Sequence, residues 1–298
     1  MAQRDLSFSS SSGDLDESAF QGTFGTGDRA RGTRTIAITS GKGGVGKTSI
    51  LANVALQLGK EGKRVLILDG DLGMSNVDIM FAARAERSIR DVMRGECTAQ
   101  EALIQVARNV SLLPGGSGVF ELQNLCAFEK QVLLDQVGGL GTDFDFMLID
   151  TAPGIADNVL FLNSAAQEIC VIVTPDPASI ADSYALIKVL NQRHRENRFS
   201  IVCNQVRDDA EGLRLFRRID DVASRFLCVG LDYKGCIPND PILRHTIKAQ
   251  ELVCRTRADA PSAEALRKLA NRLRGPAAEV ESCKGGLQFF WERVLHVA

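Results

Sequence analysis

The stretch SGKGGVGKTS at residues 40–49 has the residue types and the spacing of a phosphate-binding loop. It fits the pattern G-x-x-x-x-G-K-[ST] through Gly41, Gly46, Lys47 and Thr48. In such a loop the backbone N–H groups surround a di- or triphosphate, the lysine binds the β- and γ-phosphates, and the hydroxyl binds Mg²⁺. We therefore expect a bound nucleotide, held by Gly41, Gly43, Gly44, Val45, Gly46, Lys47, Thr48 and Ser49.

Three carboxylates follow apolar runs elsewhere in the chain. Asp69 and Asp71 end the stretch LILDGD, and Asp150 stands in MLIDTAPG. A carboxylate directly after a buried strand is well placed to hold Mg²⁺ or its water beside a phosphate loop. We therefore expect Thr48, Asp69 and Asp150 to form a metal site, with structural capping as the alternative for Asp69 and Asp71.

The elements that must position these residues alternate between strand and helix patterns. TIAIT at 35–39 predicts a buried strand before the loop, and residues 49–60 carry an apolar helical face after it. Further strands are predicted at 64–71, 111–114, 144–151, 168–175, 198–206 and 225–232, with a last domain helix at 264–274. This alternation predicts an α/β fold, a mainly parallel twisted sheet with helices on both faces and the ligand at the carboxyl ends of the strands.

The chain divides into four parts by composition. Residues 1–33 are rich in Ser, Gly and Asp and predict a disordered arm, and residues 34–275 form the domain. A linker at 276–286 leads to an amphipathic helix at 287–298. The net charge of −2 lacks the footprint of a nucleic-acid binder, and the eight cysteines contain no C-x-x-C pair. We expect a cytoplasmic protein with reduced thiols.

The loop KGGVGKT resembles the deviant Walker A signature of the MinD/ParA family of P-loop NTPases. The resemblance covers about residues 34–275 and implies a slow, partner-stimulated ATPase that dimerises on ATP. In that family the first lysine of the loop, here Lys42, reaches the ATP of the other subunit. The second acidic residue of the D-x-D turn, here Asp71, orients the attacking water. The catalytic residues implied are thus Lys42, Lys47, Asp71 and Asp150, with ATP and Mg²⁺ bound.

The same resemblance assigns the switches and the side that faces the base. DLGMSNVD (71–78) resembles switch I, so Asn76 and Asp78 are expected to respond to the γ-phosphate, and DTAPGI (150–155) with Gly154 resembles switch II. Asn204 in VCNQV is placed like the family's adenine-reading asparagine. Pro238 and Asp240 in IPND match the second base-side loop. An ordinary turn role is the alternative for these loop residues.

The C-terminal LQFFWERVLHVA places its apolar residues on one arc at helical spacing, namely Leu287, Phe290, Trp291, Val294 and Leu295. Such a helix predicts reversible, peripheral binding to the anionic surface of the inner membrane. A helix docked in a groove of the domain is the alternative, and docking without ATP followed by release in the dimer combines the two.

This tail favours the MinD and FlhG branches of the family, and stretches such as GDLGMSNVDIMF and TPDPASIADSYALIKVL look closer to FlhG. That branch implies control of the placement or number of flagella and a partner such as an FlhF-like GTPase or a flagellar switch protein. The arm has no clear copy of the branch's GTPase-activating helix. A MinD-like role in cell division stays open.

Three rival functions also stay open. Residues 244–274 carry eight cationic against three acidic side chains, which leaves a ParA-like, DNA-partitioning role as a less favoured alternative. A metal-cluster carrier of the same fold requires paired cysteines that the spacing does not supply. A binding module with a purely structural ATP is excluded if turnover is lost in an Asp71→Ala variant.

Overall fold

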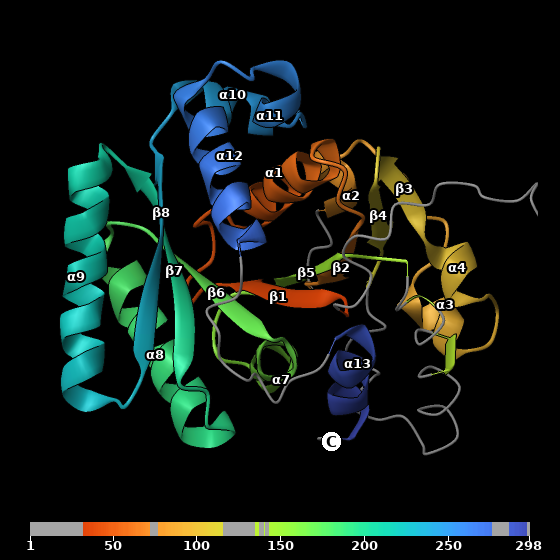
Figure 1. The fold of residues 1–298 in the computed structure, drawn as a ribbon, viewed down its shortest axis with the longest axis horizontal. Coiled ribbons are helices and arrows are strands. Elements are labelled where there is room, and N and C mark those ends of the chain that lie inside the picture. The colour runs from red at the N-terminus through yellow and green to blue at the C-terminus, as the bar shows by residue number, and fades with distance from the viewer. Residues whose placement is uncertain are drawn as a thin grey trace, which may run out of the picture. The chain divides into compact units, whose positions relative to one another are not determined.

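Within the described residues, eight strands form one sheet in the order β3-β4-β2-β5-β1-β6-β7-β8 (Figure 1). The computed structural model describes residues 32–71, 77–115, 135–136, 140, 143–275 and 286–296. All neighbouring strands are parallel except β3 and β4. The strands are β1 (Arg34–Thr39), β2 (Val65–Gly70), β3 (Ile104–Ala107), β4 (Val110–Leu113), β5 (Phe146–Thr151), β6 (Glu168–Val173), β7 (Arg198–Val206) and β8 (Gly230–Pro238).

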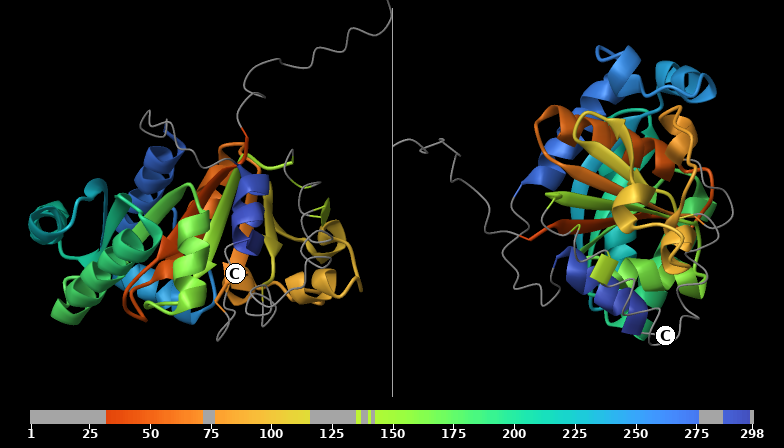
Figure 2. Two further views of the ribbon diagram at one scale, coloured as in Figure 1. Left: turned by 90° about the horizontal axis from the view of Figure 1, so that it is seen from below. Right: turned by 90° about the vertical axis from the view of Figure 1, so that its right-hand side faces the viewer.

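Helices cover both faces of this sheet (Figure 2). One face packs against α1 (Lys47–Lys60), α2 (Val77–Met80), α11 (Val253–Thr256) and α12 (Pro261–Arg274), with α10 (Pro241–Lys248) beside them. The other packs against α3 (Ile89–Met93), α4 (Ala99–Ala102), α7 (Asp157–Ala165), α8 (Pro177–His194), α9 (Asp209–Phe226) and α13 (Leu287–His296). Because both faces are covered, the central strands are apolar along nearly their whole length.

The predicted α/β class is confirmed, and most predicted strands lie where the pattern placed them. The strand predicted at 225–232 is wrong in its position. Helix α9 continues to Phe226, because Leu215, Ile219 and Ala223 keep its buried face at helical spacing. The last strand of the sheet is β8, which begins at Gly230 and runs on to Pro238.

The two ends of the described chain also refine the predicted boundaries. Thr33, assigned to the arm, is buried and its Oγ1 donates a hydrogen bond to the carbonyl of Phe144 at 2.8 Å, so it belongs to the domain. The rest of the arm, except Gly32, and linker residues 276–285 lie outside the described residues. No helix of the described chain is long and apolar enough to span a bilayer.

Helix α13 lies on the face of the sheet that α7 covers (Figures 1 and 2). The five apolar residues predicted to meet a membrane are at most 2% exposed, and they pack with Ala37, Leu66, Leu68, Ile149 and Phe161. Phe290 and Trp291 meet edge to face, with ring centroids 5.4 Å apart. In this structure the helix is therefore docked on the domain, as in the alternative reading of its sequence.

Candidate nucleotide site

The loop between β1 and α1 has the backbone that its glycines allow. Gly44 and Gly46 adopt φ angles of 76° and 95°, in the left-handed region that other residues rarely enter, and Gly46 caps α1. A Cβ on Gly41 would lie 2.1 Å from the backbone carbon of Asp182 in α8, so only glycine fits there. The loop's N–H groups at the start of α1 make this end of the sheet suited to bind phosphate.

The predicted switch II segment lies against the start of the loop. The N–H of Gly154 donates to the carbonyl of Ser40 at 2.9 Å, and Gly154 has a φ of 97°. The Ser40 hydroxyl donates to the Lys42 carbonyl at 2.7 Å, which fixes the turn out of β1. The Gly154 hydrogen bond therefore links the switch II segment directly to the start of the loop.

The carboxylates of Asp69 and Asp150 meet beside the loop. They are register partners at the ends of the neighbouring strands β2 and β5, and each residue is 1% exposed. The hydroxyl of Thr48, in the first turn of α1, donates to Asp150 Oδ2 at 2.6 Å. Oδ1 of Asp150 is buried and has no hydrogen-bond partner among the described residues.

The pKa of Asp150 is raised to about 7, chiefly by burial; the Thr48 hydrogen bond opposes the shift and the nearby Asp69 adds to it. Lys47 is also buried, which lowers the pKa of its ammonium group, although Asp150 and Asp71 act in the opposite direction. The structure thus brings Lys47, Asp71 and Asp150 into mutual electrostatic range. Asp71 in turn donates its backbone N–H to Asp69 Oδ1 at 3.2 Å.

These groups fit a magnesium ion. A buried, unpaired carboxylate oxygen is costly, and a divalent cation would satisfy it. Thr48 and Asp150 supply hard oxygen atoms, and Asp69 adds a second carboxylate beside them. The same carboxylates are mutually repulsive without a cation, which is the cause of part of the raised pKa of Asp150.

Lys42 does not lie with this group. Its ammonium forms an ion pair with the carboxylate of Asp176, the N-cap residue of α8, and its side chain is 41% exposed. Asp176 is not among the site residues predicted from the sequence. The Asp-Pro start of a helix was the available signal, but it indicates a cap and not a partner for Lys42.

Asn204 lies against the loop at the end of β7. Its Nδ2 donates to the carbonyl of Val45 at 2.7 Å, and its Oδ1 accepts the N–H of Gln205 at 2.9 Å. One amide hydrogen and one lone pair of Asn204 are left for a base. Its adenine-reading role stays a prediction.

Pro238 ends β8, and Asp240 caps α10 two residues later. The carboxylate of Asp240 accepts hydrogen bonds from the Ile242 N–H and from the Ser262 hydroxyl, at 2.8 and 2.6 Å. Burial opposes ionisation of Asp240, but these hydrogen bonds hold its pKa below the usual range. Asp240 therefore ties the loop to the start of α12, and its contact with a base stays a prediction.

The predicted switch I residues are only partly described. Asp78 lies in the first turn of α2, where its Oδ1 accepts the N–H of Ile79 at 2.8 Å. Asn76 lies outside the described residues. Ile79, directly after the switch I segment, and Ile155, the last residue of the switch II segment, are 41% and 49% exposed.

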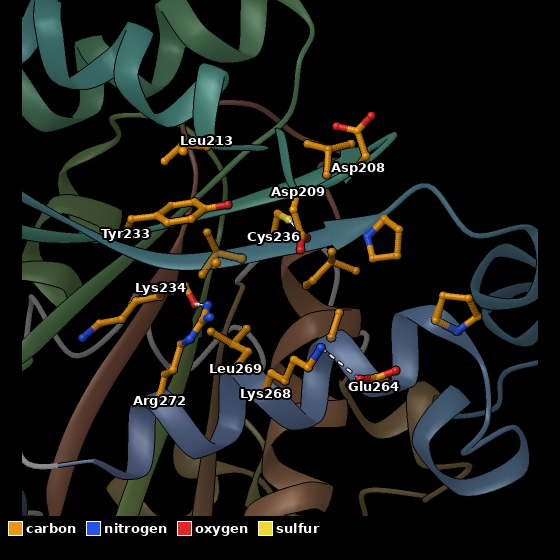
Figure 3. A pocket seen from close by; sticks show the side chains of 17 residues that line it. Asp208, Asp209, Leu213, Tyr233, Lys234, Cys236, Glu264, Lys268, Leu269 and Arg272 are labelled. Carbon is orange, nitrogen blue, oxygen red and sulfur yellow. Dashed lines mark hydrogen bonds and ion pairs between the residues drawn. The ribbon is translucent and has the colours of Figure 1, made fainter. Parts of the chain in front are cut away.

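A pocket that is separate from the phosphate loop lies at the β8 edge of the sheet, between α9 and α12 (Figure 3). Its volume is about 450 Å³, and no residue of the phosphate loop lines it. Cys236 donates to Asp209 Oδ1 at 3.1 Å on its α9 side, and Arg272 donates to the Lys234 carbonyl at 2.6 Å on its α12 side. The charged and polar groups of this pocket are thus largely paired with each other.

The fold and the loop together define a P-loop nucleotide-binding protein. The ParA family model, described as NUBPL iron-transfer P-loop NTPase, matches residues 31–274. The antiactivator FleN of Pseudomonas aeruginosa is 35% identical over 88% of this chain and 93% of its own length. The flagellum site-determining protein YlxH of Helicobacter pylori is 31% identical over 90% and 92%.

Solved structures of related proteins have a similar fold. MinD in the MinC:MinD complex of Aquifex aeolicus matches with a TM-score of 0.66 and 26% identity, over 84% of this chain and 99% of that one. MinD of Pyrococcus horikoshii, complexed with Mg-ADP, matches with a TM-score of 0.63 and 26% identity over 83% and 100%. The chain belongs to the ParA/MinD family of P-loop NTPases. Among the described residues, no group of three or more His, Cys, Asp or Glu side chains could hold a metal ion.

Proposed function

We propose that the chain is a slow ATPase that dimerises on ATP, associates reversibly with the inner membrane and regulates the placement or number of flagella. The observation that carries the proposal is the pairing of two features in one loop. Thr48 and the half-satisfied Asp150 form a site for a magnesium nucleotide, whereas Lys42 of the same loop points to the surface. The Mg-ADP complex of a MinD relative supports the choice of nucleotide and metal.

In the proposed reaction, water attacks the γ-phosphorus of ATP in line with the bond to the β-phosphate oxygen, which breaks to give ADP and phosphate. Asp71 holds the attacking water, and Lys47 offsets the charge on the transferred group together with Lys42 of the other subunit. Thr48 and Asp150 would hold Mg²⁺, which would supply positive charge to offset that of the phosphates. Because the described site offers no strong base, turnover is slow and depends on a partner.

Two features of the surface support dimerisation. Lys42 is exposed at the edge of the nucleotide site, where it can meet a phosphate outside its own loop. Ile79, next to the switch I segment, and Ile155, in the switch II segment, are large apolar side chains, and both are half exposed. A second copy of the chain would remove these side chains from water while it brings Lys42 to its nucleotide.

The membrane step uses α13. Leaving its groove exposes five buried side chains, each worth about 1.5–3 kcal/mol, so the helix stays docked until lipid takes the place of the groove. Two released helices on one dimer bind a membrane by avidity, which makes binding depend on ATP.

The chain between α12 and α13 can allow this release. Arg34 donates to the carbonyls of Leu273 and Gly275, at 2.6 and 2.8 Å, and Gly286 lies beside Thr33. Both ends of the stretch 276–285 are therefore near the start of β1. Ten residues can extend to about 33 Å, which is far more than this separation requires.

The flagellar role rests on the relatives, one of which is called flagellum site-determining. The partner would be an FlhF-like GTPase or another flagellar protein. The test is to express the chain in a Helicobacter pylori strain that lacks YlxH and to count and map flagella by electron microscopy. We expect the wild-type chain, but not its Lys47→Ala variant, to restore the distribution, and equal counts with both variants would contradict the proposal.

Turnover is the matching test in vitro. Purified protein with Mg²⁺ and ATP should release phosphate, and Asp71→Ala should abolish release while nucleotide binding remains. Retained turnover in Asp71→Ala would remove the proposed catalytic role, and absence of turnover in the wild type with anionic vesicles would support a purely structural nucleotide.

A further inference from the structure

The ion pair between Lys42 and Asp176 joins the phosphate loop to the start of α8. The ammonium of Lys42 donates to Oδ2 of Asp176, and the two side chains are 41% and 43% exposed. The contact holds the pKa of the Asp176 carboxyl below its usual range, chiefly through the hydrogen bond from Lys42. Among the described residues, Asp176 is the ion-pair partner of Lys42.

The topology of the sheet brings these residues together. Strands β1 and β6 are parallel neighbours, with Thr39 opposite Val171. Lys42 lies three residues beyond the end of β1, and Asp176 lies three residues beyond the end of β6. Both side chains therefore emerge at the carboxyl edge of the sheet, which is where the nucleotide binds.

Asp176 has a separate task in its own helix. Its Oδ1 accepts the N–H of Ala178 at 3.4 Å, and its carbonyl accepts the N–H of Ile180 at 3.2 Å. The backbone N–H groups of Ala178 and Ser179 both favour the charged form of this carboxyl. Asparagine is as good an N-cap residue as aspartate, so it would keep the cap and lose only the charge. That negative charge is favourable at the start of α8, and it also forms the ion pair with Lys42.

We propose that Asp176 is a positioning residue that holds Lys42 within its own subunit until a second nucleotide-bound subunit arrives. In the dimer the Lys42 ammonium exchanges the Asp176 carboxylate for the γ-phosphate of the other subunit's ATP. The carboxylate then competes with phosphate for one cation. ADP, which lacks that phosphate, does not win the exchange. The inference rests on the proposed ATP-dependent dimerisation and names a residue that regulates it.

The competition is weak because exposed ion pairs contribute little to stability in water. A pair of this exposure corresponds to about a two- to fivefold change in an equilibrium constant for each Lys42. Removing the charge of Asp176 should therefore tighten the dimer by a small, measurable factor. The gain should shrink as salt screens both attractions.

The test measures the dimer dissociation constant by sedimentation equilibrium with Mg²⁺ and a non-hydrolysable ATP analogue. Asp176→Asn keeps the cap and removes the charge, and Asp176→Glu restores the charge. Asp221→Asn on α9 is the matched control, because it removes one exposed acidic charge far along the chain from the loop. Lys42→Gln and the double variant Lys42→Gln, Asp176→Asn complete a cycle.

We expect Asp176→Asn to tighten the dimer about two- to fivefold per Lys42, Asp176→Glu and Asp221→Asn to behave as the wild type, and Asp176→Asn to have no effect without Lys42. A dimer that is unchanged or weaker in Asp176→Asn would overturn the inference, and so would a gain that persists in the Lys42→Gln background. A wild-type chain that stays monomeric with the analogue would overturn the proposed dimerisation itself and this inference with it.

Discussion

Asp69 and Asp150 are register partners on β2 and β5, and both carboxylates are almost completely buried next to Lys47. Two buried carboxylates at neighbouring strand ends are unfavourable when both are charged. Under the proposed function, a magnesium nucleotide would relieve this repulsion when it binds. The site would then gain affinity for the nucleotide at the expense of the stability of the free protein.

This trade predicts how stability of the free protein depends on pH. The pKa of Asp150 is about 7 in the folded chain and about 4 when unfolded. Between these values the folded state holds a proton that the unfolded chain has lost, so the free energy of unfolding falls as pH rises. At pH 8 we expect Asp150→Asn to unfold at a higher urea concentration than the wild type, with a free energy of unfolding that is larger by about 2–4 kcal/mol. At pH 4 the two free energies of unfolding should be nearly equal.

Urea titrations in EDTA without nucleotide measure this difference. The same variant should lose the stabilisation that Mg²⁺ and ATP give to the wild type. If Asp150→Asn is less stable than the wild type at pH 8, the carboxylate contributes to the fold and the trade described above does not exist.

Alanine substitutions at Gly41 and at Gly44 should lower the free energy of unfolding by different amounts. A Cβ on Gly41 meets the backbone of Asp182 and Ser183 at 2.1 and 2.5 Å, and backbone atoms cannot move aside. A Cβ on Gly44 has no neighbour within 4 Å, but Gly44 has a φ of 76°. We expect Gly41→Ala to cost about 3 kcal/mol or more and Gly44→Ala about 1–2 kcal/mol, measured by urea unfolding. Equal losses of stability in the two variants would contradict the close approach of Gly41 to α8.

Trp291 is the chain's single tryptophan and is fully buried in the docked α13, so its fluorescence reports on the helix. We expect emission typical of an apolar surrounding in the free and ADP-bound protein. With a non-hydrolysable ATP analogue and anionic vesicles, brominated lipids should quench this emission. Lipid quenching that is the same with ADP would mean that release of α13 does not depend on the γ-phosphate.

Asn204 offers a test of the base side. Its remaining amide hydrogen and lone pair can match the donor and acceptor of the adenine edge, and guanine presents these in the reverse order to an amide that Val45 and Gln205 hold in one orientation. Asn204→Ala should raise the dissociation constant for ATP about tenfold, as expected for one lost amide pair, and should change that for GTP much less. Equal losses for both nucleotides would leave Asn204 with only its contact to Val45.

The fold and the neighbouring positions of Thr48, Asp69 and Asp150 were predictable because they depend on local spacing. The phosphate loop, Thr48 and the carboxylates at strand ends need only a short pattern and the rule that parallel strands end at one edge. The apolar arc of α13 was also predictable from its period.

Other features depend on tertiary structure. The period of α13 could not say what covers its apolar face, which is the domain in this structure. The ion pair of Lys42 joins residues 134 positions apart and depends on β1 lying beside β6. The end of α9 was misplaced because residues 225–232 are apolar enough to resemble a strand, whereas packing on β7 and β8 extends the helix to Phe226.

In the proposed function, ATP converts this chain into a membrane-bound dimer. Sedimentation of the full chain with vesicles that contain phosphatidylglycerol tests it most directly, with a non-hydrolysable ATP analogue, ADP or no nucleotide, and with Lys42→Gln beside the wild type. We expect the wild type to bind the vesicles only with the ATP analogue, and Lys42→Gln to bind them little under any condition. Equal binding with all three, or none with any, would contradict it.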